Sequence, residues 1–422
     1  MIAIVLIAII GDWNPDAALK VGWRLPAALL LLGLAYEHWM LSRARWRVQL
    51  DAPAKIYLGR ETRVELSLAH ALARRLDVEV SPTAPSFVAM DPRIEALRIE
   101  PEHTGSFVLT VTGTRLGEFA WPETPLRVAG PLGLAWWPRE VSCGCSIRVM
   151  PDLLRSEDEA KSVAAIGASP AVQAGGGAEV LRLRDYREGD PPRLVDWKAT
   201  ARAGRLISRD YSQERGLSIV LLVDAGRSSE LRAGSLDRFA HYVNVAARLA
   251  QYAASREDLV GLVVYADRPL AALAPARGAP AVSRLRAVLA ASQIERTESN
   301  PMYAVARVKS LVRHRSLVIV LTDFDDASAQ SQLAHAVRFL LPKHLPFVAG
   351  LSSAAAERLA TTAGTDWLDP YKSLAAQEYC TGLERKVRSL NAMGAPALAA
   401  RPELLERAVF AAYERFNRQR RA

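Results

Sequence analysis

The sequence predicts a doubly wound α/β domain in the C-terminal half, preceded by a small antiparallel β-sandwich and an N-terminal transmembrane helical hairpin. After residue 217, nearly continuous apolar runs alternate with stretches of helical periodicity, as in parallel sheets covered on both faces. Short polar–apolar alternations separated by Pro and Gly come before them, and two apolar segments come first. The expected parts are a membrane hairpin (1–46), a sandwich (47–150), a connector (151–178), a charged hairpin (179–216) and the α/β domain (217–422).

Composition bounds the class of protein. The chain has 422 residues, 50% of them hydrophobic, and a net charge of +9, which fits two to three domains with sizeable cores. Basic residues are interleaved with acidic ones along the chain, which favours a position beside an anionic membrane surface over nucleic-acid binding. Cysteine is sparse, so a disulfide framework and a zinc site are not expected, and a reducing compartment fits.

The N-terminus predicts membrane insertion. Residues 1–10 are wholly apolar but span only about 15 Å, so they form a short span, a span with its start upstream, or a signal peptide that lacks a basic n-region. Residues 21–41 span about 31 Å, enough to cross a bilayer, although a buried soluble helix would look similar. Arg43, Arg45 and Arg47 follow at once and predict that the rest of the chain is cytoplasmic.

The middle region predicts strands without catalytic residues. Alternating runs occur at residues 63–68, 76–80 and 106–111. Trp136 and Trp137 are interpreted as packing residues rather than as a ligand platform.

The C-terminal half predicts strands and helices in alternation. The expected strands are 217–223, 259–265, 316–322, 346–351 and 396–399, and the expected helices are 236–255, 282–292, 303–313, 329–340, 377–393 and 404–421.

The segment before the first of these strands is dense in alternating charge. It can be a solvated hairpin with surface ion pairs, each worth about 0–1 kcal/mol. It can also be a rigid polar docking surface, because arginines pair with carboxylates in bidentate fashion. The candidate partner-binding residues are Arg184, Asp185, Tyr186, Gly189, Asp190, Arg193, Asp196, Trp197 and Arg202.

This segment also carries a family resemblance. The run L-R-D-Y-R-E-G-D-P-P-R-L-V-D-W-K-A-T-A-R, then S-R-D-Y and Glu214, resembles the signature of the domain-of-unknown-function 58 family, bacterial membrane proteins with a von Willebrand factor A-like (vWA) domain. Gly130-Pro131-Leu132-Gly133-Leu134 resembles a turn of that family. The resemblance implies a vWA-like fold for residues 217–422, a MoxR-type AAA+ ATPase as partner, and no defined biochemical activity.

Carboxylates follow three of the predicted parallel strands, where such sheets bind ligands: Asp224, Asp267 and Asp323. The vWA resemblance implies a Mg²⁺ site with D-x-S-x-S after the first strand, a Thr from another loop and a later Asp. Asp224, Ser228 and Asp323 match this pattern, but Gly226 replaces the first Ser. The Thr loop is not evident, and Ser299-Asn300-Pro301 in its place looks like a helix N-cap. The expected site is therefore degenerate, and the alternative is that these acids cap neighbouring loops.

The expected function is a membrane-anchored protein-interaction module, not an enzyme, working with a MoxR-type ATPase in envelope-related assembly or maturation. Its expected location is the inner membrane, with the bulk of the chain cytoplasmic and no nucleic-acid partner. The alternative is a metal-dependent hydrolase of the phosphatase type using Asp224. That chemistry needs a second carboxylate at position 226, where Gly226 stands.

Overall fold

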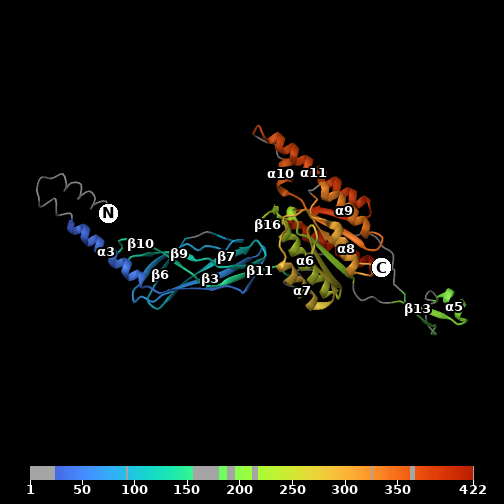
Figure 1. Ribbon diagram of the computed structural model, residues 1–422, viewed down its shortest axis with the longest axis horizontal. Coiled ribbons are helices and arrows are strands. Elements are labelled where there is room, and N and C mark those ends of the chain that lie inside the picture. Colours follow the sequence, from blue (N-terminus) through green and yellow to red (C-terminus); the bar gives the residue numbers. More distant parts are fainter. Residues whose placement is uncertain are drawn as a thin grey trace. The chain divides into compact units, whose positions relative to one another are not determined.

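The computed structural model describes residues 24–91, 94–154, 180–187, 195–211, 217–324, 327–361 and 366–421. The chain divides into two compact units, Met1–Met150 and Pro151–Ala422 (Figure 1). The first predicted apolar segment, residues 1–10, lies outside the described residues.

The first unit is a β-sandwich-like region, as the alternation predicts. Its sheets have the orders β1-β3-β7-β5, β10-β9-β4-β6 and β2-β11-β8. Along β3, Val64, Leu66 and Leu68 are buried while the intervening residues are more exposed. Its strands are β1 (Trp46–Asp51), β2 (Lys55–Tyr57), β3 (Glu61–His70), β4 (Leu76–Val80), β5 (Val88–Met90), β6 (Glu95–Ile99), β7 (Thr104–Gly113), β8 (Gly117–Ala120), β9 (Thr124–Ala129), β10 (Trp136–Val141) and β11 (Ser146–Met150).

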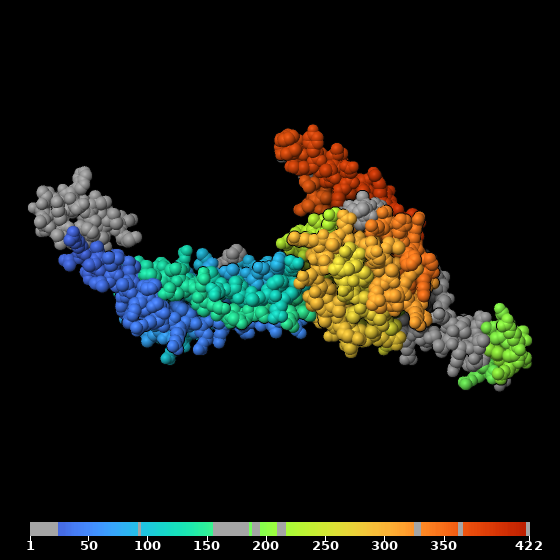
Figure 2. All heavy atoms as spheres, viewed as in Figure 1, coloured from blue at the N-terminus to red at the C-terminus, as the bar shows by residue number. Residues whose placement is uncertain are grey.

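One helix precedes the sandwich. Helix α3 (Arg24–Ser42) is the one helix within the described part of the chain that is long and apolar enough to cross a membrane. Its leucines 25, 29, 31 and 32 are 65–72% exposed, and only Glu37 and Leu41 are buried. In Figure 2 its N-terminal half (dark blue) stands clear of the strands. The helix therefore presents an apolar surface that the described strands of the first unit do not cover.

A local disulfide lies in the connection between β10 and β11. Cys143 and Cys145 are bonded, with their Cα atoms 5.5 Å apart, and Gly144 between them has a positive φ of 62°. Cys380 is free. This bridge is not predicted by the sparse cysteine content, and because it spans a single residue it does not connect distant segments.

The charged hairpin belongs to the second unit. Strand β12 (Val180–Asp185) pairs antiparallel with β13 (Ile207–Tyr211), and helix α5 (Trp197–Ala203) lies between them in sequence.

A six-stranded sheet forms the body of the second unit. Its order is β18-β17-β14-β19-β20-β21, and all neighbours are parallel except β17 and β18. The strands are β14 (Ser218–Asp224), β17 (Leu259–Tyr265), β18 (Pro269–Ala276), β19 (Leu317–Leu321), β20 (Leu345–Leu351) and β21 (Ala397–Ala400). Strand β18 was not predicted, because its Leu-Ala-Ala-Leu-Ala-Pro run lacks the β-branched residues that favour strands.

Helices cover this sheet. Val220 and Leu222 of β14 pack in one core with residues of α8 (Pro301–Leu311), α9 (Ala327–Leu340) and α11 (Asp369–Ala392). The alternate side chains Ile219 and Leu221 are equally buried, and α6 (Arg238–Ser255), α7 (Gly278–Ala291) and α12 (Pro402–Arg421) also contact strands of this sheet. Short helix α10 (Ala354–Thr361), not predicted, packs on α11. The result is a mixed α/β unit with a mostly parallel sheet.

Candidate functional site

The candidate site lies where the strand order of the sheet reverses. From β14 the chain moves to β17 and β18 on one side, and later returns to β19, β20 and β21 on the other side. Asp224 ends β14, and Thr322 and Asp323 directly follow β19, the neighbouring parallel strand. The carboxyl ends of strands at such a reversal form the usual ligand crevice of an open α/β sheet.

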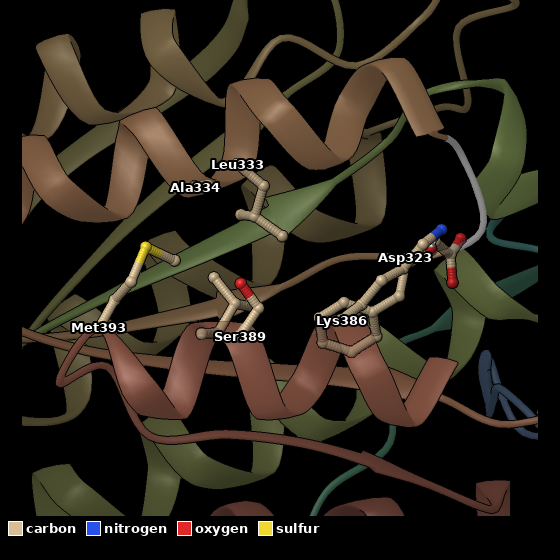
Figure 3. A pocket seen from close by; sticks show the side chains of 8 residues that line it. Asp323, Leu333, Ala334, Lys386, Ser389 and Met393 are labelled. Atoms are coloured by element: carbon tan, nitrogen blue, oxygen red, sulfur yellow. Dashed lines mark hydrogen bonds between the residues drawn. The ribbon is translucent and has the colours of Figure 1, made fainter. Parts of the chain in front are cut away.

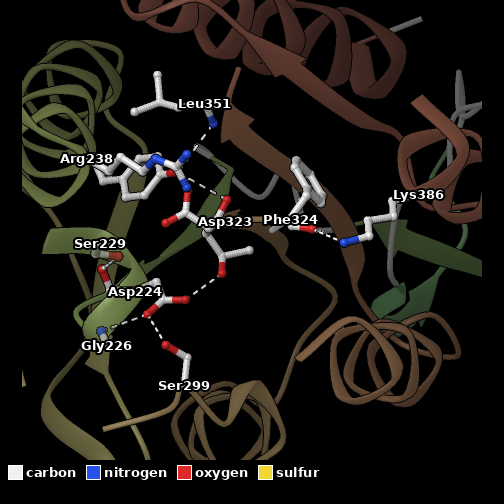
Figure 4. A network of polar contacts seen from close by, with 11 residues as sticks. Asp224, Gly226, Ser229, Arg238, Ser299, Asp323, Phe324, Leu351 and Lys386 are labelled. Carbon is white, nitrogen blue, oxygen red and sulfur yellow. Dashed lines mark hydrogen bonds and ion pairs between the residues drawn. The ribbon is translucent and has the colours of Figure 1, made fainter. Parts of the chain in front are cut away.

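Asp224 is fully engaged by groups of the chain itself. Its Oδ1 accepts hydrogen bonds from the Gly226 backbone N–H at 2.9 Å and from the Ser299 hydroxyl, and its Oδ2 accepts one from the Thr322 hydroxyl at 2.5 Å (Figure 4). The residue is 1% exposed. Burial raises its pKa above the usual range, although the donated hydrogen bonds act in the opposite direction. Asp224 is therefore an interior acceptor rather than an open carboxylate.

Ser299 supplies a hydroxyl beside Gly226, the residue that replaces the first serine of the motif. A Cβ added at Gly226 would lie 2.1 Å from the Ser299 Oγ, so that oxygen fills the room a side chain at position 226 would need. The prediction of an N-cap here is confirmed, because the Asn300 side chain accepts from the Met302 N–H at 3.1 Å and begins α8. The sequence pattern indicates only the N-cap, and not the hydrogen bond from the preceding serine to Asp224.

The main chain fixes the segment that carries Ser299. The Arg227 N–H donates to the Thr297 carbonyl at 2.9 Å, and the Glu295 N–H donates to the Ala225 carbonyl at 2.7 Å. These two bonds hold the connection between α7 and α8 against the end of β14.

Asp323 is paired with a buried arginine that sequence reasoning missed. Its Oδ1 lies 2.9 Å from Arg238 Nη1 and accepts a hydrogen bond from the Tyr242 hydroxyl at 2.7 Å. The two charged side chains are 7% and 2% exposed. Burial and the charge of Asp323 raise the pKa of Tyr242 well above its ordinary value. One signal was present: Arg238 begins α6, where the helix dipole disfavours a cation unless a carboxylate compensates.

The predicted Mg²⁺ ligands do not fit a metal ion as they stand. Asp224 and Asp323 come together at adjoining strand ends, but the guanidinium of Arg238 already balances Asp323. Ser228 lies in the 3-10 turn Arg227–Glu230, where it is Ser229 whose hydroxyl bonds the Asp224 carbonyl, at 3.0 Å. Within the described ranges, no three His, Cys, Asp or Glu side chains form a group able to hold a metal. Metal binding stays a prediction that this geometry does not favour.

Some of the predicted partner-binding residues lie in the described part of the charged hairpin. The Asp196 side chain accepts from the Lys198 and Ala199 N–H groups and caps α5, so it has a structural role. Asp185 pairs with Arg205 at 3.0 Å, both exposed, and Trp197 is 66% exposed. Tyr186 donates its N–H to the Leu206 carbonyl at 3.0 Å, Arg184 lies opposite Ser208 in the ladder, and Arg202 is exposed in the last turn of α5. Gly189, Asp190 and Arg193 lie outside the described residues.

Two of the hollows among the described residues lie near the sheet ends. A cleft of about 440 Å³ is lined by residues of α10, α11 and the segments next to β20 and β21, including Glu357 and Cys380. Burial and two nearby glutamates raise the pKa of the Cys380 thiol, so it lacks the activation of a catalytic nucleophile. The pocket in Figure 3 holds only about 20 Å³, room for about one water, and the Lys386 ammonium beside it donates to the Phe324 carbonyl.

The burial of Asp224 predicts a specific pH dependence of stability. Because its pKa is raised in the folded state, the folded chain holds a proton that the unfolded chain releases once pH exceeds the usual aspartate range. The contribution of Asp224 to the free energy of unfolding should therefore fall as pH rises from about 4 to 7. Asp224→Asn removes this titration, and thermal unfolding of both proteins across that range should show the wild type losing stability relative to the variant. A constant difference between them would contradict the assignment.

Comparison with known proteins identifies one domain. Residues 182–349 match the family described as "Protein of unknown function DUF58". No curated protein matches the chain. Among solved structures, the proteins to which the chain shows weak similarity include the following three. An Escherichia coli alpha-2-macroglobulin fragment has 18% identity and TM-score 0.21, covering 26% of this chain and 17% of that one. A Porphyromonas gingivalis protein of unknown function has 22% identity and TM-score 0.19, covering 25% and 47%. A CARDB domain from Pyrococcus furiosus has 10% identity and TM-score 0.16, covering 25% and 94%.

Similarities at such TM-scores bear on neither the fold nor the function of this chain. The chain spans only 17% of the length of the E. coli fragment. The family match covers the charged hairpin and the sheet through most of β20, including Asp224, Ser299 and Asp323. The chain therefore contains a DUF58 family domain, from a family of unknown function, at residues 182–349.

Proposed function

We propose that this chain is a membrane-anchored protein-interaction module. Helix α3 crosses the inner membrane, the bulk of the chain lies in the cytoplasm, and a MoxR-type AAA+ ATPase is the partner in envelope-related assembly or maturation. We assign residues 217–422 a vWA-like fold on this view, since the strand order with one antiparallel strand beside β17 is compatible with it.

The membrane assignment is carried by the exposed apolar face of α3. Nineteen residues of helix rise about 28 Å, close to the hydrocarbon thickness of a bilayer. Only 11% of the apolar stretch within this helix is buried, whereas the core helix of a soluble protein is mostly buried. Arg43 follows the helix and stacks over Trp39 at 3.9 Å, an arrangement suited to the membrane interface.

The interaction assignment is supported by how the strand-end carboxylates are used. Asp224 accepts three hydrogen bonds and Asp323 is bound by Arg238 and Tyr242, so both stabilise the fold. A phosphatase-type reaction would need Asp224 accessible and ionised, and it would need an acid at position 226. The burial of Asp224, its raised pKa and Gly226 all weigh against that alternative.

The exposed tryptophan of the charged hairpin offers the sharpest test. Trp197→Ala should weaken binding of the purified full chain, in detergent, to the MoxR-type ATPase of the same organism by about 30-fold or more, because exposed aromatic anchors dominate interface energetics. The measurement is the Kd by biolayer interferometry.

A matched variant is Trp367→Ala on the segment before α11, where the side chain is 75% exposed. It should leave the Kd unchanged. Equal losses in both variants, or no binding by the wild-type chain, would refute a docking role for the hairpin. Asp196 is unsuited to this test because its loss would uncap α5.

A further inference from the structure

A buried glutamate ties α3 to the sandwich. Glu37 is 0% exposed. Its Oε1 accepts from the Leu132 and Leu134 N–H groups at 2.9 and 3.2 Å, and its Oε2 accepts from Trp137 Nε1 at 3.1 Å. The carboxylate thus joins the helix to the turn at residues 130–135.

The glycines of that turn make the approach possible. A Cβ at Gly130 would lie 2.0 Å from the Glu37 carboxyl carbon, so no larger residue could close onto it. Gly133 has a positive φ of 69° and donates its N–H to the Gly130 carbonyl at 2.8 Å. The turn is therefore shaped as a cradle for a carboxylate that an apolar helix would not otherwise carry.

The same turn rests on the helix one turn closer to its N-terminus. A Cβ at Gly33 would lie 2.6 Å from Leu134 Cδ1 and 3.6 Å from Leu132 Cδ1, so the absence of a side chain there seats both leucines. Four residues separate Gly33 from Glu37, a rise of about 6 Å along the helix. The leucines therefore reach past the buried carboxylate, toward the apolar half of α3.

Both leucines remain partly exposed although they contact the helix. Leu132 is 54% and Leu134 is 42% exposed. On the helix, Leu29 and Leu32 are 69% and 67% exposed, and Tyr36 is 42% exposed. Turn and helix form one continuous apolar surface, and the aromatic and arginine residues that suit headgroups come after it along the helix.

We propose that the turn at residues 130–135 is a membrane-inserted loop. Leu132 and Leu134 enter the acyl region beside α3, and the Glu37 carboxylate holds the turn there, seating the sandwich directly on the bilayer surface. Lipid is the occupant because this surface continues that of the spanning helix. The inference rests on the proposed membrane span, and it adds a second, peripheral contact that fixes how the sandwich meets the membrane.

The test uses the full chain in phosphatidylethanolamine–phosphatidylglycerol vesicles, with Cys143, Cys145 and Cys380 replaced by serine. A nitrobenzoxadiazole fluorophore is attached at Leu132→Cys, at Leu29→Cys on the helix, or at Ile94→Cys, a 70% exposed position on the sandwich. Phospholipid brominated in its acyl chains should quench the label at 132 nearly as strongly as at 29, and should leave the label at 94 unquenched. Adding Glu37→Leu should abolish quenching at 132 and preserve it at 29.

The outcomes separate the two claims. Quenching at 29 with none at 132 overturns the inserted loop and leaves the membrane anchor standing. No quenching at 29 overturns the anchor itself, and the loop with it. Unchanged quenching at 132 in the Glu37→Leu chain overturns the role of the carboxylate.

Discussion

Replacing Arg238 by methionine is expected to lower the free energy of unfolding of the α/β unit by about 3–5 kcal/mol, the usual cost of leaving one partner of a buried ion pair alone. The reason is that Asp323 would stay charged and 2% exposed, with the Tyr242 hydroxyl as a neutral donor that cannot balance its charge. Thermal unfolding of the full chain in detergent, with hydrogen exchange at the amides of β14 and β19, reports on this unit separately from the sandwich.

A matched variant distinguishes burial from loss of an arginine. Arg227 pairs with Glu298 at 2.9 Å, but these side chains are 59% and 58% exposed. Arg227→Met should therefore cost only about 0–1 kcal/mol. Arg238→Met combined with Asp323→Asn should recover much of the loss, because no unpaired charge remains. If Arg238→Met costs no more than Arg227→Met, the buried ion pair contributes no more to stability than the exposed one, which would contradict this prediction.

Changing Gly226 to serine is expected to destabilise the same unit by about 1–3 kcal/mol, because the new side chain would overpack the site. Its Cβ would meet the Ser299 Oγ at 2.1 Å and the Thr297 carbonyl oxygen at 3.1 Å. Backbone strain is not the cause, since Gly226 has an ordinary extended conformation with φ −77° and ψ 178°. The measurement is again thermal unfolding of the full chain.

The double variant Gly226→Ser with Ser299→Gly moves one hydroxyl from one loop to the other and should restore most of the stability. It also completes the D-x-S-x-S spacing. Calorimetry with millimolar Mg²⁺ should still show no binding, because Arg238 continues to balance Asp323. Binding by the double variant or by the wild-type chain would contradict the misfit of the site to a metal ion.

Much of the fold could be predicted because it follows from local patterns of apolar and polar residues. Continuous apolar runs predicted β14 and β19, with Asp224 and Asp323 at their ends. Alternation of polar and apolar residues predicted the sandwich strands. Strand β18 was not predicted, because its pairing with β17 rather than its own composition makes it a strand.

The partners of the two aspartates could not be predicted in this way. Ser299 is 75 residues from Asp224 and Tyr242 is 81 residues from Asp323, so their contacts depend on how helices and loops meet above the sheet. The motif predicts a role for Ser228, but the serine that donates to the Asp224 carboxylate is Ser299. A motif gives the spacing along one loop, so it cannot predict a hydroxyl that comes from another loop. The burial of Glu37 likewise depends on distant groups, because the Leu132 and Leu134 N–H groups that donate to it lie 95 and 97 residues away.

The clamped connection between α7 and α8 bears on how this chain can be divided or modified. Residues 292–300 have the composition of an ordinary surface linker, a natural place for an epitope tag, a fusion or a domain boundary. Yet the Glu295 and Thr297 backbones are bonded to the end of β14, and Ser299 completes the shell around Asp224. An insertion there would break these hydrogen bonds and destabilise the second unit, so tags and fusions should be placed in other loops.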